Sequence, residues 1–330
     1  MEVGQIKRLV LIGLVILFSL STTQSHASMG GSIDTSNDRI VPIFTNLFDS
    51  SAAFSGFLYS PRILFTAGHS PMNVGNYVGM PNSKADGTGP KVKVVKKYVA
   101  PEYDAGRATR DFAIYVLEKD LAPVTPFPLM TPEIEKQLIA ANAKVRIHGY
   151  GIYGPGLGCA AGDRTVCQDD LRYKSVEPRM VELTAHSSSE IRNLIGREFR
   201  TEIKDHFLMF SGSTSGPCPG DSGGSITATH NGINYYVGPT PNGDNVYACG
   251  HGRSDGTRGI HYSSQIYYHL NLLSEAEEFV KQAKATELTT PVVVIQPEPK
   301  KKSIICVKNG KTRKVSGIAP KCPTGFKKKK

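Results

Sequence analysis

The middle of the chain alternates short hydrophobic runs with turns rich in Gly, Pro and Asn. Between about Phe44 and Tyr262 these runs have the length and composition of β-strands. They cover residues 54–60, 62–68, 91–100, 111–118, 144–152, 206–212, 224–230 and 234–238. Because no helical pattern alternates with them, they favour an antiparallel barrel or sandwich over a parallel sheet.

Two local patterns add a hairpin and a helix. Asn231-Gly232 separates two strand-like runs and suits a two-residue turn with positive φ. From Ser263 to Ala285, apolar residues recur at helical spacing with Glu and Lys between them, which predicts a helix packed on the barrel. Those apolar residues are Ile266, Leu270, Leu273, Ala276 and Val280. Residues 191–205 fit either another helix or a long loop.

The N-terminus has the three parts of a secretory signal. Lys7 and Arg8 precede an apolar run over residues 9–20, and Ser25-His26-Ala27 forms a small-x-small cleavage site. A membrane anchor is the competing interpretation, but the run is shorter than the roughly 20 residues that span a bilayer. We therefore expect residues 1–27 to be removed and the protein to be secreted, periplasmic or attached to the cell surface.

The composition then divides the remainder into three parts. Residues 28–285 form the predicted main domain, and residues 286–302 read as an extended linker because they are Pro-bearing and lack an apolar pattern. Residues 303–330 form a small basic tail. We expect the protein to be a monomer.

Six cysteines fit an oxidising destination. They can pair in many ways, and the simplest pairing is sequential: Cys159–Cys167, Cys218–Cys249 and Cys306–Cys322. Zinc binding is the rival use of cysteine, but the sequence has no C-x-x-C pair and no H-E-x-x-H. We expect no metal and no cofactor.

Positive charge is concentrated in the last part of the chain. From Thr286 to Lys330 there are 12 Lys or Arg against 2 Glu, a net +10 that equals the formal charge of the whole chain. The tail is either a solvated extension or an adhesive for an anionic cell-surface polymer or lipid. Since Phe326 is the one aromatic residue of the tail, we expect no specific nucleic-acid partner.

The segment "CPGDSGGS" at residues 218–225 places Ser222 on a tight glycine-rich turn. A serine nucleophile needs a base, an acid that orients the base, and donors for the oxyanion. His69 follows an apolar strand in "ILFTAGHS", and Asp111 opens one in "TRDFAIYVLE". The backbone amides of Gly220 and Ser222 can point at one spot.

Each of these residues alone has a structural explanation. A histidine after a strand is usually a packing residue, and an aspartate that opens a strand usually forms a turn. Asp104 also lies close to Asp111 in the sequence, but the apolar run after Asp111 favours Asp111 as the partner of His69.

The order His, Asp, Ser and the quoted motifs resemble the trypsin/chymotrypsin-like serine endopeptidases, of the type that bacteria secrete. "TAGHS" is similar to T-A-A-H-C, "DFAIYVL" to D-I-A-L-L-x-L and "CPGDSGG" to C-x-G-D-S-G-G, over residues 28–285. The resemblance implies an all-β fold of two six-stranded antiparallel barrels with a C-terminal helix. It implies protein or peptide substrates and an acyl-enzyme on Ser222. His69 is then the base, Asp111 the orienting acid, and the amides of Gly220 and Ser222 the oxyanion hole.

The resemblance also implies a specificity pocket beside Cys218–Cys249. Its floor is at Gly216, where trypsin-like members carry an aspartate, so a neutral side chain is expected before the cleaved bond. The walls lie at Thr240, Pro241, Asn242, Gly243 and Gly259. Asp255 reaches the pocket only if its loop folds inward.

Two departures from the family pattern concern a disulfide and activation. Phe54 and Ser70 occupy the positions of a bridge that the family often has beside the histidine. Family members commonly pair a new N-terminal amine with the aspartate before the nucleophile, here Asp221. Our hypothesis is that signal peptidase exposes this terminus near Ser28, because Ile40 lies too close to His69.

The sequence also allows a second class of function. The chain can be an inactive protease-fold binding protein that attaches to anionic surfaces through its tail. Inactive relatives usually lose one of the three catalytic residues, and all three are present here, which favours the enzyme. An esterase is a weaker alternative with the same chemistry.

Overall fold

The computed structural model describes residues 31–70, 73–104, 109–153, 174–196, 205–210, 216–240, 260–289 and 302–329. The chain divides into two compact units, Met1–Gln282 and Ala283–Lys330. The predicted signal peptide lies outside the described residues.

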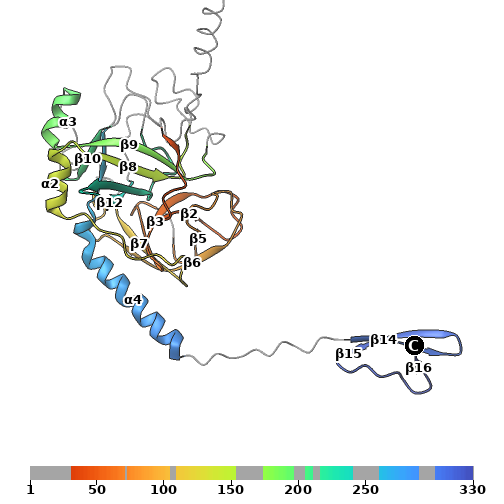
Figure 1. Ribbon diagram of the computed structural model, residues 1–330. Helices are drawn as coiled ribbons and strands as arrows, with labels where there is room; N and C mark the ends of the chain where they lie inside the picture. Colours follow the sequence, from red (N-terminus) through yellow and green to blue (C-terminus); the bar gives the residue numbers. More distant parts are fainter. Residues whose placement is uncertain are drawn as a thin grey trace, which may run out of the picture. The chain divides into compact units, whose positions relative to one another are not determined.

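Six antiparallel strands close into a barrel in the first half of the larger unit (Figure 1). Around the barrel they are β2 (Ile40–Phe44), β3 (Phe54–Ser60), β4 (Ile63–Thr66), β7 (Ala113–Leu117), β6 (Lys91–Val99) and β5 (Tyr77–Gly79). Aliphatic side chains such as Val41, Leu58 and Leu64 fill its interior. Burial of these apolar side chains is the main force that holds such a barrel closed.

The second sheet is also antiparallel and runs in the order β12, β11, β8, β9, β10, β13. These strands are β12 (Ile233–Pro239), β11 (Ser225–His230), β8 (Lys144–Gly149), β9 (Arg179–His186), β10 (Phe207–Phe210) and β13 (Ile260–Ser263), and β1 (Ser32–Ile33) pairs with β9. The hydroxyl of Ser263 donates to the carbonyl of Pro239 at 2.7 Å, which links the two end strands. The predicted all-β, two-barrel class is confirmed, with a closed first barrel and a half-barrel second sheet.

The predicted hairpin is confirmed in detail. His230 pairs with Ile233 across a two-residue turn, and Asn231 and Gly232 have φ of 49° and 77°. Positive φ at both central residues is the conformation that Asn-Gly accommodates with least strain.

Within the described residues, three α-helices flank the sheets. α2 (Pro132–Ala140) is capped by Thr131, whose side chain accepts a hydrogen bond from the amide of Ile134. α3 (Ser188–Ile195) begins the segment that the sequence left open between helix and loop. The C-terminal helix starts later than predicted, because Ser263 still belongs to β13. A 3₁₀ turn (Ile266–His269) leads into α4 (Leu270–Thr289).

The C-terminal helical segment is anchored on the sheets by buried side chains. Ile266 and Ala276 are fully buried in the main core. None of the helices within the described ranges is both long and apolar enough to cross a membrane.

An aromatic cluster joins the two halves of the larger unit. The ring of Tyr236 on β12 stacks on Phe57 of β3 with centroids 4.7 Å apart, and lies 5.1 Å from Phe65 of β4. Tyr236 is fully buried, and its hydroxyl has no hydrogen-bond partner in the part of the chain that the structure describes. The cluster therefore holds the barrels together at the cost of one unsatisfied polar group.

The smaller unit contains a three-stranded sheet. β14 (Lys302–Lys308) pairs with β15 (Lys311–Gly317) and with β16 (Lys327–Lys328). The turn between β14 and β15 is a second Asn-Gly turn, with φ of 47° at Asn309 and 75° at Gly310. The predicted Cys306–Cys322 disulfide is present, with its Cα atoms 5.6 Å apart.

Replacing Tyr236 by Phe should stabilise the protein. The variant keeps the ring stack and removes a buried hydroxyl that has no hydrogen-bond partner among the described residues. We therefore expect the free energy of unfolding to rise by about 1 kcal/mol. The melting temperature should rise by about 2–4 °C. Tyr115→Phe is the matched control: its hydroxyl donates to Ser70 at 3.2 Å, so its loss should destabilise. A Tyr236→Phe variant that melts at or below the wild-type temperature would contradict this account.

Candidate active site

His69 and Asp111 are held together at the ends of two neighbouring strands. His69 follows β4 and Asp111 precedes β7, and these strands are paired. His69 Nδ1 lies 2.7 Å from Asp111 Oδ2, and the backbone amide of His69 donates to Asp111 Oδ1 at 2.8 Å. The carboxylate is 2% exposed, so it acts on the imidazole with little screening by water.

The backbone beside this pair is closely packed at Gly68 and left-handed at Arg110. A Cβ on Gly68 would lie 3.0 Å from the amide nitrogen of Phe112 and 3.2 Å from Asp111 Oδ1. Arg110 takes a left-handed φ of 50°, and its guanidinium lies 3.6 Å above the ring of Tyr268. Asp104, the sequence alternative to Asp111, instead pairs with Thr109 in an isolated bridge.

The two positions of the missing disulfide are both packed. Phe54 sets its ring edge-on to the imidazole of His69 with centroids 6.0 Å apart. Ser70 is buried and accepts a hydrogen bond from the hydroxyl of Tyr115 at 3.2 Å. An aromatic contact therefore supports His69 where the family often has a covalent bridge.

The carboxylate of Asp221 organises the turn that carries Ser222. Asp221 is fully buried, and its two oxygens accept hydrogen bonds from the amides of Gly151 at 2.7 Å and Cys218 at 2.8 Å. A Cβ on Gly149 would lie 2.4 Å from Asp221 Oδ1, and one on Gly151 would lie 2.5 Å from both Cγ and Oδ2. The carboxylate thus occupies space that only glycine leaves open.

The turn itself has the left-handed conformation that its glycines permit. Gly220 has φ of 96° and Gly223 has φ of 80°. The amide of Gly223 donates to the carbonyl of Thr240 at 2.9 Å, and that of Gly224 donates to the backbone carbonyl of Asp221 at 2.8 Å. These bonds fix the backbone on both sides of the half-buried Ser222.

The turn packs against the strand that leads to His69. A Cβ on Gly223 would lie 2.0 Å from Thr66 Oγ1 and 3.0 Å from the amide nitrogen of Ala67. Ser222 therefore lies beside the end of β4. The structure joins His69 directly to Asp111, whereas the Ser222 hydroxyl makes no hydrogen bond to His69 within the described residues.

Two of the predicted pocket residues lie within the described ranges. The carbonyl oxygen of Gly216 lies 3.8 Å from the sulfur of Cys218. Thr240 is 1% exposed. Pro241, Asn242, Gly243 and Gly259 lie outside the described residues, as do Asp255, Cys159–Cys167 and Cys249, the predicted partner of Cys218. Within the described ranges no group of three His, Cys, Asp or Glu is arranged to bind a metal ion.

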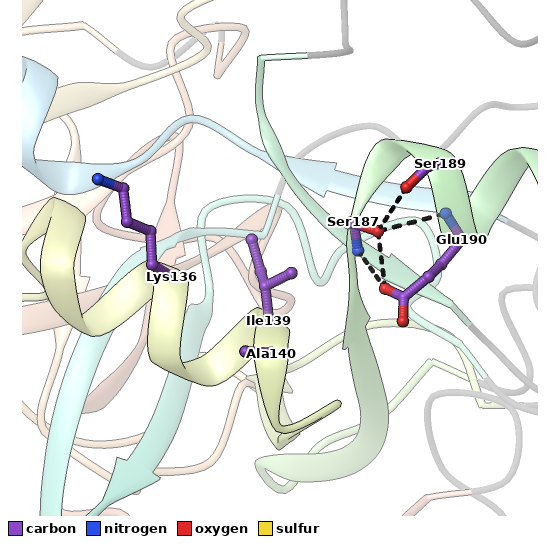
Figure 2. A pocket seen from close by; sticks show the side chains of 6 residues that line it. All are labelled: Lys136, Ile139, Ala140, Ser187, Ser189 and Glu190. Carbon is purple, nitrogen blue, oxygen red and sulfur yellow. Dashed lines mark hydrogen bonds between the residues drawn. The ribbon is translucent and has the colours of Figure 1, made fainter.

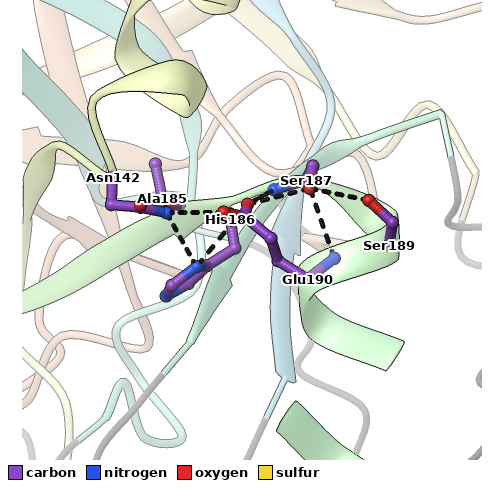
Figure 3. Close-up of polar contacts among 6 residues, drawn as sticks. All are labelled: Asn142, Ala185, His186, Ser187, Ser189 and Glu190. Carbon is purple, nitrogen blue, oxygen red and sulfur yellow. Dashed lines mark hydrogen bonds and ion pairs between the residues drawn. The ribbon is translucent and has the colours of Figure 1, made fainter. Parts of the chain in front are cut away.

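A surface hollow of about 450 Å³ lies away from the predicted site residues, between α2 and the start of α3 (Figure 2). Lys136, Ile139, Ala140, Ser187, Ser189 and Glu190 line it. The polar groups beside it satisfy one another (Figure 3). Asn142 Nδ2 donates to the carbonyl of Ala185 at 3.3 Å and to Glu190 Oε1 at 3.2 Å. Ser187 and Glu190 form the capping box of α3, so these contacts have a structural explanation.

A buried histidine packs against Phe112, the residue that follows Asp111. His269 stacks on Phe112 with centroids 4.3 Å apart, and His269 Nε2 lies 2.7 Å from the hydroxyl of Ser264. Burial, with smaller effects of Arg110 and His206, lowers the pKa of His269 to about 3. Between about pH 3 and pH 6.5 the imidazole of His269 is therefore protonated in the unfolded chain and neutral in the folded chain.

Stability should consequently fall as the pH drops below about 6.5, the ordinary pKa of histidine. Between pH 7 and pH 5 His269 alone contributes a loss of about 2 kcal/mol. In His269→Gln the difference in melting temperature between these two pH values should shrink, although the variant is less stable at pH 7. His230→Gln, next to the exposed hairpin turn, is the control and should keep the wild-type difference. An unchanged pH dependence in His269→Gln would contradict the assignment.

The comparisons with known proteins agree with this geometry. A family model described as trypsin matches residues 31–257, more than half of the 330-residue chain. No curated protein gives a significant match. The matched region contains His69, Asp111 and Ser222, together with most of both sheets. The chain therefore belongs to the trypsin family of serine proteases.

Proposed function

We propose that this member of the family is an active serine endopeptidase that cleaves peptide bonds through an acyl-enzyme on Ser222. The observation that carries the proposal is the 2.7 Å contact between His69 Nδ1 and the buried carboxylate of Asp111. A carboxylate at Nδ1 holds the proton there and leaves Nε2 free to accept the proton of a serine.

The reaction then follows from the roles of the chain's own groups. Ser222 Oγ attacks the carbonyl carbon of the substrate while His69 takes the hydroxyl proton. The amides of Gly220 and Ser222 donate to the oxyanion of the tetrahedral intermediate. His69 next gives its proton to the leaving amine. Water then attacks the acyl carbon while His69 takes a proton from it, and His69 returns that proton to Ser222 Oγ as the acid product leaves.

Several finer features belong to this proposal. The protein is exported, and cleavage near Ser28 creates an amine that pairs with Asp221. Cleavage after Arg39 is disfavoured because Arg39 is held in the barrel: its guanidinium donates to the carbonyls of Leu58, Tyr59 and Thr125 at 3.3, 3.2 and 2.8 Å. Substrates carry a neutral side chain before the cleaved bond, because Gly216 offers no carboxylate to a Lys or Arg.

The tail completes the proposal. Residues 302–329 contain no Asp or Glu, and their basic residues are Lys302, Lys308, Lys311, Arg313, Lys314, Lys321, Lys327, Lys328 and Lys329. A small sheet that is closed by the Cys306–Cys322 disulfide and carries only positive side-chain charges is suited to adhesion to an anionic polymer or lipid surface. The alternative of an inactive binding protein is disfavoured because His69 and Asp111 have the contact that catalysis requires.

A fluorophosphonate probe should label the secreted wild-type protein, and Ser222→Ala should abolish labelling. Asp111→Asn should reduce the rate of labelling by about 10³–10⁴, since it removes the carboxylate that sets the imidazole tautomer. Folded wild-type protein that the probe leaves unlabelled would reject the proposed activity. With enzyme that reacts with the probe but has not been treated with it, faster cleavage after Arg than after Phe or Ala would reject the neutral preference.

The tail should retain the protein on anionic surfaces. Full-length protein should sediment with vesicles that contain phosphatidylglycerol, and much less so at 0.5 M salt, where the Debye length falls to about 4–5 Å. A chain that ends at Pro297 should stay in solution. A full-length Lys308→Gln/Lys311→Gln/Lys314→Gln variant is the matched control and should bind with intermediate strength. Equal retention of full-length and shortened chains would exclude adhesion through the tail.

A further inference from the structure

Ser55 lies inside β3 at the point where the first barrel meets the Ser222 turn. Its hydroxyl accepts a hydrogen bond from the amide of Tyr150 at 2.9 Å and lies 2.8 Å from the carbonyl oxygen of Gly220. An amide can only donate and a carbonyl can only accept, so the hydroxyl proton must point at Gly220. Ser55 is fully buried, and water therefore does not compete for these bonds.

The backbone of Ser55 contacts the other end of the same turn. Its amide donates to the carbonyl of Ser222 at 3.0 Å, and its carbonyl accepts from Thr66 Oγ1 at 3.1 Å. One residue of the first barrel thus touches Gly220 and Ser222, the two residues whose amides form the predicted oxyanion hole.

The hydroxyl of Ser55 completes the anchoring of one peptide plane. The amide of the Gly220–Asp221 peptide donates to the carbonyl of Cys218 at 2.9 Å, and the carbonyl of that peptide accepts from Ser55. Gly220 has φ of 96° and no side chain that would restrict its rotation. Without Ser55 the carbonyl of Gly220 loses this donor, and the bond from the Asp221 amide to Cys218 is the hydrogen bond that still restrains the plane.

We infer that Ser55 is a positioning residue for the oxyanion hole. Its hydroxyl holds the peptide plane that follows Gly220, and that plane joins the plane of the Gly220 amide at the Gly220 Cα. The bond thereby restrains the torsion angles of Gly220 and, through them, the direction in which the Gly220 amide points. This inference rests on the proposed function, because the oxyanion hole is part of the proposed reaction. The effect belongs to the transition state, so losing the hydroxyl should lower kcat and leave KM nearly unchanged.

The simpler explanation is that Ser55 only satisfies buried groups between the barrels. Its removal would then lower stability and nothing else. Ser264→Ala provides the matched comparison, because Ser264 is 1% exposed, its hydroxyl also makes one short side-chain contact, and it lies outside the Ser222 turn.

The test compares full-length wild type, Ser55→Ala, Ser55→Thr and Ser264→Ala in two measurements. The first is hydrogen exchange of the peptide that covers residues 218–224, where the amides of Asp221, Gly223 and Gly224 are hydrogen-bonded. The second is kcat and KM on a peptide substrate. Exchange reports the order of the turn whether or not the chain is active.

In Ser55→Ala we expect exchange in this peptide to be about tenfold faster. We expect kcat to fall by about 10–100-fold, less than the 10²–10³ that follows loss of an oxyanion donor itself. Ser55→Thr should restore most of both properties, and Ser264→Ala should change neither.

Three results would overturn the inference. The first is exchange in Ser55→Ala that equals exchange in Ser264→Ala. The second is faster exchange with unchanged kcat, and the third is a folded Ser55→Thr protein without recovery. A wild type that is inactive would reject the proposed function instead, and the exchange comparison would still decide whether Ser55 orders the turn.

Discussion

The buried carboxylate of Asp221 is the constraint on which the candidate site depends. A fully buried charge is tolerated only when hydrogen-bond donors surround it, and here the amides of Gly151 and Cys218 supply two. To bring those donors within reach, the end of β8 must approach so closely that residues 149 and 151 are glycine. The geometry of the Ser222 turn is therefore set by the position in which the Asp221 carboxylate can reach these two amides.

The candidate site is built from residues of both halves of the larger unit. His69 and Asp111 belong to the first barrel, whereas Ser222 precedes β11 of the second sheet. Ser55 and the aromatic cluster around Tyr236 connect the two sides, one through hydrogen bonds and the other through apolar packing. Neither half alone contains the groups that the proposed reaction needs.

The sequence predicts the parts whose signal is local. The apolar runs that became β3, β4, β6, β7, β8, β10, β11 and β12 were predicted, as was the Asn231-Gly232 turn. β2 was missed because Pro42 interrupts its pattern, and β5 because three residues are too few to show a period. β9 lies outside the predicted runs, although its residues from Arg179 to His186 alternate buried with partly or fully exposed positions.

The candidate site shows the same division. The motifs identify His69, Asp111 and Ser222, and the structure supplies the contact between the first two. The role of Ser55 has no sequence signature, because its partners are backbone groups that every residue carries. Nor does the sequence reveal that Phe54 packs on His69, since only the folded chain brings β3 beside the end of β4.

The tail has almost no core, and this has a consequence for where it can work. Of the described residues 302–329, Cys306 is the one that is fully buried, and it is part of the disulfide to Cys322. So small a sheet owes much of its order to that bond, which restricts the unfolded chain. We therefore expect the same residues to be a flexible polycation in a reducing compartment. The folded form of the tail therefore depends on an environment in which Cys306 and Cys322 stay oxidised.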